Sequence, residues 1–163
     1  MQHRLPSPSR LAVVCAALLA GACIRTRTDP VTGKIDVDVE SPTKKGEDWK
    51  AGIAGTSGYG SITGQGRAAV LNGQSTITIN LNGLTPNATH SWRVFEGKCG
   101  GAGPMFGSAG AYPDFTVSGT GTAQASAKLS MALDEAKTYN VRIYATPGDM
   151  NTVAACGDLS DSA

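Results

Sequence analysis

Short stretches in which apolar and polar residues alternate recur along the second half of the chain. They cover residues 75–81, 91–96, 122–131 and 139–145. Because successive side chains of a strand point to opposite faces of a sheet, the alternation predicts strands. Asn-Gly and Pro-Gly pairs lie between several of the stretches and favour tight turns. The pattern predicts an all-β domain, built as an antiparallel sandwich or barrel.

Two of the predicted strands carry large side chains on both faces. In the first, Trp92 and Val94 fall on one face, which we expect to fill the interior, and Arg93 and Phe95 fall on the other. In the second, Val141 and Ile143 fall on one face, and Arg142 and Tyr144 fall on the other.

Residues 24–58 lack this regularity and are rich in charged residues, Thr, Pro and Gly. The alternation in residues 34–40 allows one short strand. We expect residues 23–58 to be a flexible tether, with Trp49 packing on the domain, and residues 59–163 to form the β-domain.

The first 22 residues have the three-part pattern of a secretory signal peptide. Arg4 and Arg10 precede an apolar run from Leu11 to Leu19, and small residues follow it. The run is much shorter than the roughly 20 apolar residues that span a bilayer. We therefore expect residues 1–22 to be removed on export.

The segment 19–23, Leu-Ala-Gly-Ala-Cys, resembles the lipobox of bacterial lipoproteins, in which Cys23 becomes the lipidated first residue of the mature protein. The alternative is ordinary cleavage after Ala22, which would leave a soluble periplasmic protein. By the same resemblance, Ile24 favours the outer membrane. Several acyl chains would anchor the protein firmly, since each buried CH₂ contributes about 0.8 kcal/mol.

The cysteine count favours lipidation. Cys15 leaves with the signal peptide, and Cys99 and Cys156 can pair in an oxidising compartment. Cys23 is then the odd cysteine, and lipidation gives it a use.

Charge excludes one class of partner. The chain has 14 Lys and Arg residues against 13 Asp and Glu residues. Loss of Arg4 and Arg10 with the signal peptide leaves the mature chain close to neutral. It has no long-range positive field to gather a polyanion, so we expect no nucleic-acid partner.

Three motifs resemble the Cu,Zn superoxide dismutases in order and spacing. They are Leu-Asn-Gly-Leu-Thr-Pro at 81–86, His-Ser-Trp-Arg-Val-Phe-Glu-Gly-Lys-Cys at 90–99 and Ala-Cys-Gly at 155–157. The resemblance covers roughly residues 60–158. It implies a Greek-key β-barrel of about eight antiparallel strands, and it implies a structural disulfide between Cys99 and Cys156 rather than a redox-active pair.

The chain departs from that family where the metals bind. Arg93 and Phe95 stand at two copper-histidine positions, and Tyr144 stands at a third. Residues 100–113, at the place of the zinc segment, hold no histidine, and Val153 replaces the arginine that guides superoxide. The resemblance therefore implies a domain that has lost its metal ligands.

Ligand chemistry leads to the same expectation. His90 is the one histidine outside the signal peptide, whereas a redox-cycling copper site wants several imidazoles. Arginine offers no lone pair and repels a divalent cation. We expect no catalytic metal, and we expect Arg93, Phe95 and Tyr144 to form a packed patch on the former metal face, with a cation–π contact worth about 0.5–2 kcal/mol.

These observations predict a lipid-anchored outer-membrane protein that faces the periplasm and acts, without catalysis, through the membrane and an envelope partner. Two alternatives stay open. One is superoxide dismutation at an unusual copper or zinc site. The other is Cu(I) storage by Met105, Met131 and Met150 with His90, since thioethers suit that ion.

Overall fold

The computed structural model describes the backbone of residues 23–28, 35–40 and 47–161, and the side chains from Asp48 to Asp161. The expected signal peptide, residues 1–22, lies outside the described residues. The chain divides into two units, one ending at Lys44 and one beginning at Lys45. Each unit is described by itself.

The first unit contains a two-stranded antiparallel ribbon. Strand β1 (Cys23–Thr28) pairs with β2 (Ile35–Glu40), in a register that sets Cys23 opposite Glu40 and Arg25 opposite Asp38. Strand β2 coincides with the alternating stretch in the sequence. Strand β1 begins at Cys23, whose side chain is outside the described part.

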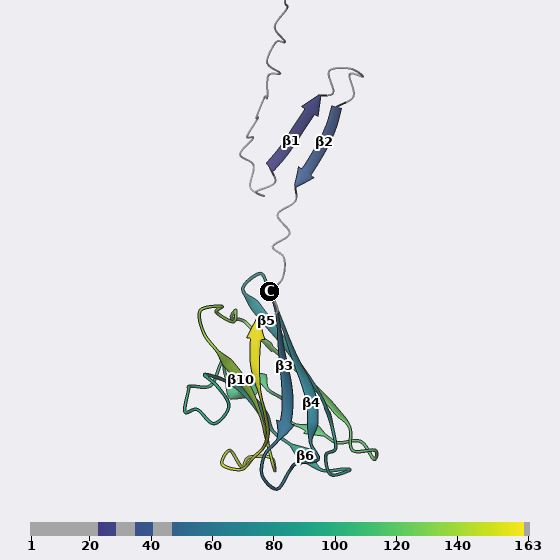
Figure 1. Cartoon of the computed structure of the whole chain (residues 1–163), viewed down its shortest axis with the longest axis vertical. Helices are drawn as coiled ribbons and strands as arrows, with labels where there is room; N and C mark the ends of the chain where they lie inside the picture. Colours follow the sequence, from purple (N-terminus) through teal and green to yellow (C-terminus); the bar gives the residue numbers. More distant parts are fainter. Residues whose placement is uncertain (1–22, 29–34, 41–46, 162–163) are drawn as a thin grey trace, which may run out of the picture. The chain divides into compact units, whose positions relative to one another are not determined.

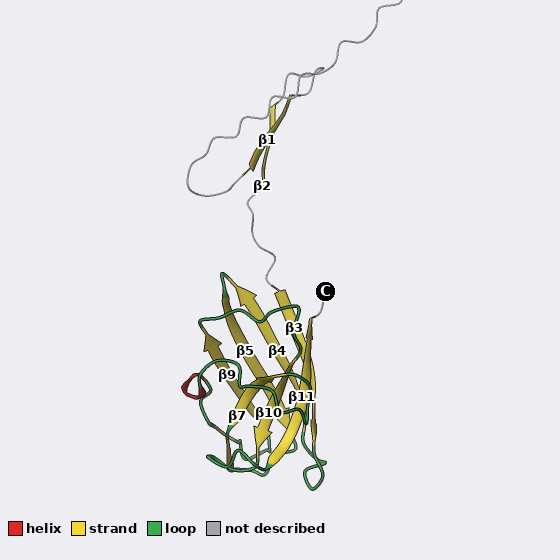
Figure 2. Ribbon diagram, turned by 90° about the vertical axis from the view of Figure 1, so that its left-hand side faces the viewer, coloured by secondary structure: helices red, strands yellow, loops and turns green. Residues whose placement is uncertain are grey.

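Seven strands of the second unit form one antiparallel sheet (Figures 1 and 2). Its order is β7–β10–β11–β3–β4–β5–β9. The strands are β3 (Glu47–Gly55), β4 (Thr63–Leu71), β5 (Gln74–Asn82), β7 (Trp92–Glu96), β9 (Ala123–Leu129), β10 (Tyr139–Tyr144) and β11 (Val153–Asp161). The prediction of an all-β, antiparallel domain is confirmed.

Three connections, from β5 to β7, from β7 to β9 and from β9 to β10, carry the chain between distant strands of this sheet. Strands β3, β4 and β5 are sequential neighbours, but the chain then reaches β7 at one edge before β9 takes the other edge beside β5. The short strands β6 (Thr89–His90) and β8 (Phe115–Thr116) form a separate two-stranded ribbon. Only Ser91 separates β6 from β7. The principal sheet thus has seven strands, and the β6–β8 ribbon is connected along the chain to its edge strand β7.

The β-domain begins earlier than the sequence indicated. Strand β3 starts at Glu47, within the range expected to be tether, and pairs with β4 on one side and β11 on the other. The sequence of β3 does not alternate between apolar and polar residues throughout, because two of the exposed positions between its buried residues are occupied by Gly52 and Ala54, which are not polar. Trp49 packs edge-to-face against Tyr139, with ring centroids 5.6 Å apart.

The interior face of the sheet carries the core. Trp92 and Val94 are fully buried, as expected, together with Val141 and Ile143. In Figure 2 strands β7, β10 and β11 cross over other strands of the same curled sheet. The buried side chains of these strands belong to one hydrophobic core cluster with those of β3, β4, β5 and β9. Burial of each such side chain contributes about 1.5–3 kcal/mol, so this face determines the strand register.

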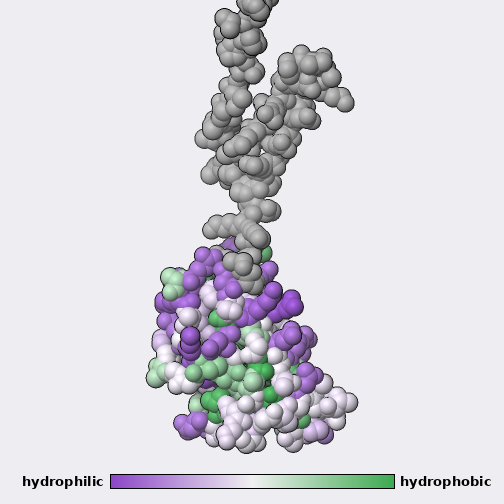
Figure 3. All heavy atoms as spheres, in the orientation of Figure 1, coloured by the Kyte–Doolittle hydropathy of each residue, from purple (hydrophilic) through white to green (hydrophobic). Residues whose placement is uncertain are grey.

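Helical structure in the described residues is limited to one 3₁₀ turn, Ala109–Ala111. None of the described segments forms a helix with the length and apolar character to cross a membrane. In Figure 3 hydrophilic residues gather over the upper part of the domain, and pale or hydrophobic residues lie lower on the same face.

Candidate functional site

Two strands place the residues that the sequence resemblance aligned with copper-ligand positions. Strands β7 and β10 are antiparallel neighbours, with Arg93 opposite Arg142 and Phe95 opposite Asn140. These residues alternate with the buried core residues, so they lie on the outer face of the sheet. We call this surface the arginine face; its members are Arg93, Phe95, Asn140, Arg142 and Tyr144.

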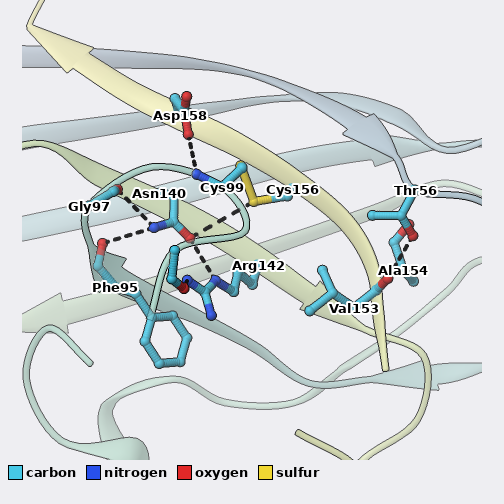
Figure 4. The surroundings of a disulfide bond; sticks show 11 residues. Thr56, Phe95, Gly97, Cys99, Asn140, Arg142, Val153, Ala154, Cys156 and Asp158 are labelled. Carbon is cyan, nitrogen blue, oxygen red and sulfur yellow. Dashed lines mark hydrogen bonds between the residues drawn. A yellow bond between two sulfur atoms is a disulfide. The ribbon is translucent and has the colours of Figure 1, made fainter. Parts of the chain in front are cut away.

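Arg142 is fixed by three contacts (Figure 4). Its Nε donates to Asn140 Oδ1 at 2.8 Å, and its Nη2 donates to the Gly101 carbonyl oxygen at 2.5 Å. Its guanidinium carbon lies 4.3 Å from the centroid of the Phe95 ring. A planar cation at this distance gains both dispersion and cation–π attraction, so the side chain is held over the ring.

Arg93 is held toward another segment. Its Nη1 donates to the carbonyl oxygens of Trp92, at 2.6 Å, and Tyr112, at 3.2 Å. Its guanidinium carbon lies 5.9 Å from the Tyr112 ring centroid. Its Nε is buried and has no hydrogen-bond partner among the described residues. The cation–π contact of Phe95 is therefore made by Arg142, and Arg93 approaches Tyr112 instead.

Tyr144 completes the arginine face and is 1% exposed. Burial raises the pKa of its phenol above 10.0, and the charge of Arg142, a side-chain hydrogen bond with Arg142 and the charge of Arg93 oppose that rise. Both cations therefore reach the phenol electrostatically. Burial raises the pKa of Tyr112 as well, and its hydroxyl donates to the Phe106 carbonyl oxygen.

A disulfide joins the loop after β7 to strand β11. The Cys99 and Cys156 sulfur atoms are bonded, with Cα atoms 6.0 Å apart, which confirms the predicted pairing. The backbone N–H of Cys99 also donates to Asp158 Oδ1 at 2.7 Å (Figure 4). Cys156 is paired in register with Arg142, so the disulfide borders the arginine face.

Hydrogen bonds connect the same loop to the buried side-chain amide of Asn140. The Asn140 amide donates to the Gly97 carbonyl oxygen at 2.8 Å, while its oxygen accepts from Arg142. Gly103 lies against the Glu96 carbonyl, where a Cβ would clash. The loop that supplies Gly101 to Arg142 is therefore closely packed at both ends.

Other residues considered for metal binding have separate places. His90 is buried, with Nδ1 2.8 Å from the Tyr144 carbonyl oxygen and its ring stacked on Phe115. Met105 forms an isolated β-bridge with Phe95. Met131 and Met150 are exposed and lie in the loops that follow β9 and β10. In the part of the chain with described side chains, no three His, Cys, Asp or Glu residues are grouped as a metal site requires.

Sequence reasoning missed three residues that organise the arginine face. Arg142 was placed beside Tyr144 by alternation but given no role. Asn140 had the same periodic placement, although nothing indicated its complete burial. Tyr112 gave no periodic indication, because the segment before β8 is irregular and approaches Arg93 only after folding.

A scan against protein-family models and a search of curated proteins gave no match to the chain.

Proposed function

We propose that this protein is an exported lipoprotein, anchored to the outer membrane through Cys23, whose domain is a non-catalytic relative of the Cu,Zn superoxide dismutases. It binds a partner in the periplasm and performs no metal chemistry. The observation that carries the proposal concerns Arg93, Phe95 and Tyr144, which stand at the three positions that resemble copper-ligand positions. Each of these side chains is engaged in contacts within the protein.

The contacts of these residues support a packed surface. Arg93 donates to two backbone carbonyls, and Phe95 is covered by the Arg142 guanidinium. Neither side chain has a lone pair for a metal. Tyr144 is a phenol whose raised pKa opposes the deprotonation that metal ligation would require. Two permanent cations beside it would also repel a copper ion.

Topology supports the proposed relationship. The sheet is antiparallel, and the chain passes between its two edges, as Greek-key connections do. The Cys99–Cys156 bond joins the loop after β7 to β11, in the order that the sequence resemblance implies. A disulfide of this kind also favours an exported location, because cytosolic thiols are kept reduced.

Elemental analysis and a dismutase assay on the native protein test the non-catalytic role. We expect copper and zinc well below one equivalent per chain, and no dismutation above a heat-denatured control. Copper addition should leave both results unchanged after dialysis. Stoichiometric copper with dismutase activity would overturn the proposal, and retained Cu(I) without activity would favour the storage alternative.

A further inference from the structure

Two arginines occupy directly opposed positions on the arginine face. Arg93 and Arg142 are paired in register across β7 and β10, and both are partly buried. Like charges at directly opposed positions destabilise a sheet. The oxygens that accept their hydrogen bonds are neutral, from three backbone carbonyls, the Asn140 amide and the Tyr144 phenol. Their mutual repulsion is not offset through those bonds.

The acidic groups beside this surface have other contacts. Asp158 is paired in register with Asn140, and its Oδ1 accepts the backbone N–H of Cys99. Asp114 Oδ1 accepts the hydroxyl of Ser91 at 2.6 Å. Both carboxylates lower the local potential, but neither bond places a carboxylate oxygen on a guanidinium nitrogen.

Both guanidinium groups are positioned in advance by their contacts, and each has more N–H bonds than those contacts use. Each carries five N–H bonds in a planar fork. Arg93 uses Nη1 for its two hydrogen bonds, and Arg142 uses Nε and Nη2. Arg93 Nη2 takes no part in these bonds, and Arg142 makes one further side-chain hydrogen bond, with the Tyr144 phenol. Side chains already fixed by packing lose little conformational entropy when a ligand binds.

We propose that Arg93 and Arg142 together bind the phosphate group of a small molecule or of a headgroup. This inference rests on the binding role in the proposed function and names its ligand class. A phosphomonoester carries a charge of roughly −1.5 to −2 near neutral pH, which offsets both cations, whereas a single carboxylate offsets one. Its oxygens also match the spacing of guanidinium N–H groups.

The first test needs no substitution. Inorganic phosphate is titrated into the purified full-length protein, and the Nε–Hε resonances of its arginines are followed by NMR. We expect saturable shifts for Arg93 and Arg142. The exposed Arg67 on β4 is an internal reference that should not shift, and sodium chloride at equal ionic strength should move none of the three. Equal shifts of all three arginines, or no shift in the pair, would overturn the proposal.

Substitutions then assign the binding energy. Arg142→Gln should weaken phosphate binding about tenfold or more, because a charge-assisted hydrogen bond is lost. Arg93→Gln should act similarly, whereas Arg67→Gln should leave the affinity unchanged. If Arg93→Gln does not fold, Arg142→Gln and the wild-type titration still decide. Unaltered affinity in Arg142→Gln would overturn the proposal.

Two ligands distinguish the possible sources of the phosphate. Tighter binding of glycerol 3-phosphate than of inorganic phosphate supports an esterified headgroup, and the reverse order supports free phosphate. Failure of both ligands overturns the phosphate site but leaves a metal-free, non-catalytic domain standing. Copper-dependent dismutation would instead overturn the proposed function, whatever the phosphate result.

Discussion

On the arginine face, the buried side chain of Asn140 determines the position of Arg142. The buried amide of Asn140 connects Arg142 to the Gly97 carbonyl, 2.8 Å away on each side. A buried polar group without such partners costs about 1–3 kcal/mol. The position of Arg142 therefore depends on an amide that is inaccessible to solvent.

The two buried phenols predict a loss of stability in alkali. In the unfolded chain a tyrosine ionises near pH 10, but burial raises the pKa of Tyr144 and Tyr112 in the folded protein. Their stabilising effect is complete below pH 10 and falls as the pH rises above it, by up to about 1.4 kcal/mol per pH unit for each phenol.

The substitution Tyr144→Phe removes one of these two ionisations and keeps the ring. We expect its free energy of unfolding to fall less steeply than that of the wild type between pH 10 and 11.5. Urea denaturation at a series of pH values gives both slopes. Identical slopes would contradict the assignment of a raised pKa to Tyr144.

Among the elements, strands β7 and β10 show what the alternating pattern predicted. It separated Trp92 and Val94 from Arg93 and Phe95, and the structure places the first pair in the core. The pattern failed at β3, because small residues occupy two of its exposed positions. Its buried residues, Trp49, Ala51 and Ile53, lie at every second position and are the part of the strand pattern that is left. Strand β3 is identified by its pairing with β4 and β11, which the local sequence does not reveal.

The disulfide between the β7 loop and β11 predicts a large effect of reduction. The bond closes a loop between residues separated by 57 positions. In the chain-entropy account this contributes about 4 kcal/mol by restricting the unfolded chain. We expect the double variant Cys99→Ser, Cys156→Ser to melt roughly 10 °C or more below the wild type.

Dithiothreitol supplies the matched control for that variant. It should lower the melting temperature of the wild type toward that of the double variant, and it should leave the double variant unchanged. Calorimetry or circular dichroism measures both. An unchanged wild-type melt under full reduction would show that the bond contributes little.

At the scale of the whole molecule, the proposed lipid anchor determines where the domain acts. The Cys23→Ser variant lacks the thiol proposed to carry the lipid, so labelled palmitate should be incorporated by the wild type and not by this variant. The variant should also leave the membrane pellet on cell fractionation. Cys15→Ser is the control, because that residue belongs to the expected signal peptide, and it should be labelled and pelleted normally. Equal labelling of Cys23→Ser would contradict lipidation there.

By itself the sequence determined the all-β class, the inward face of β7 and the pair of cysteines that join. The first two depend on alternation, which is a property of short segments, and the third depends on the number and order of the cysteines. The identities of Arg93, Phe95 and Tyr144 are likewise fixed by the sequence.

Only the tertiary structure decided the neighbours of those side chains. It brought Arg142 to Phe95, Arg93 to the Tyr112 carbonyl, and β3 into the middle of the sheet. Each contact joins residues on different strands or loops, and its geometry depends on register and chain crossing. A periodic pattern specifies which face a residue takes, whereas the contacts across that face arise when distant strands pair.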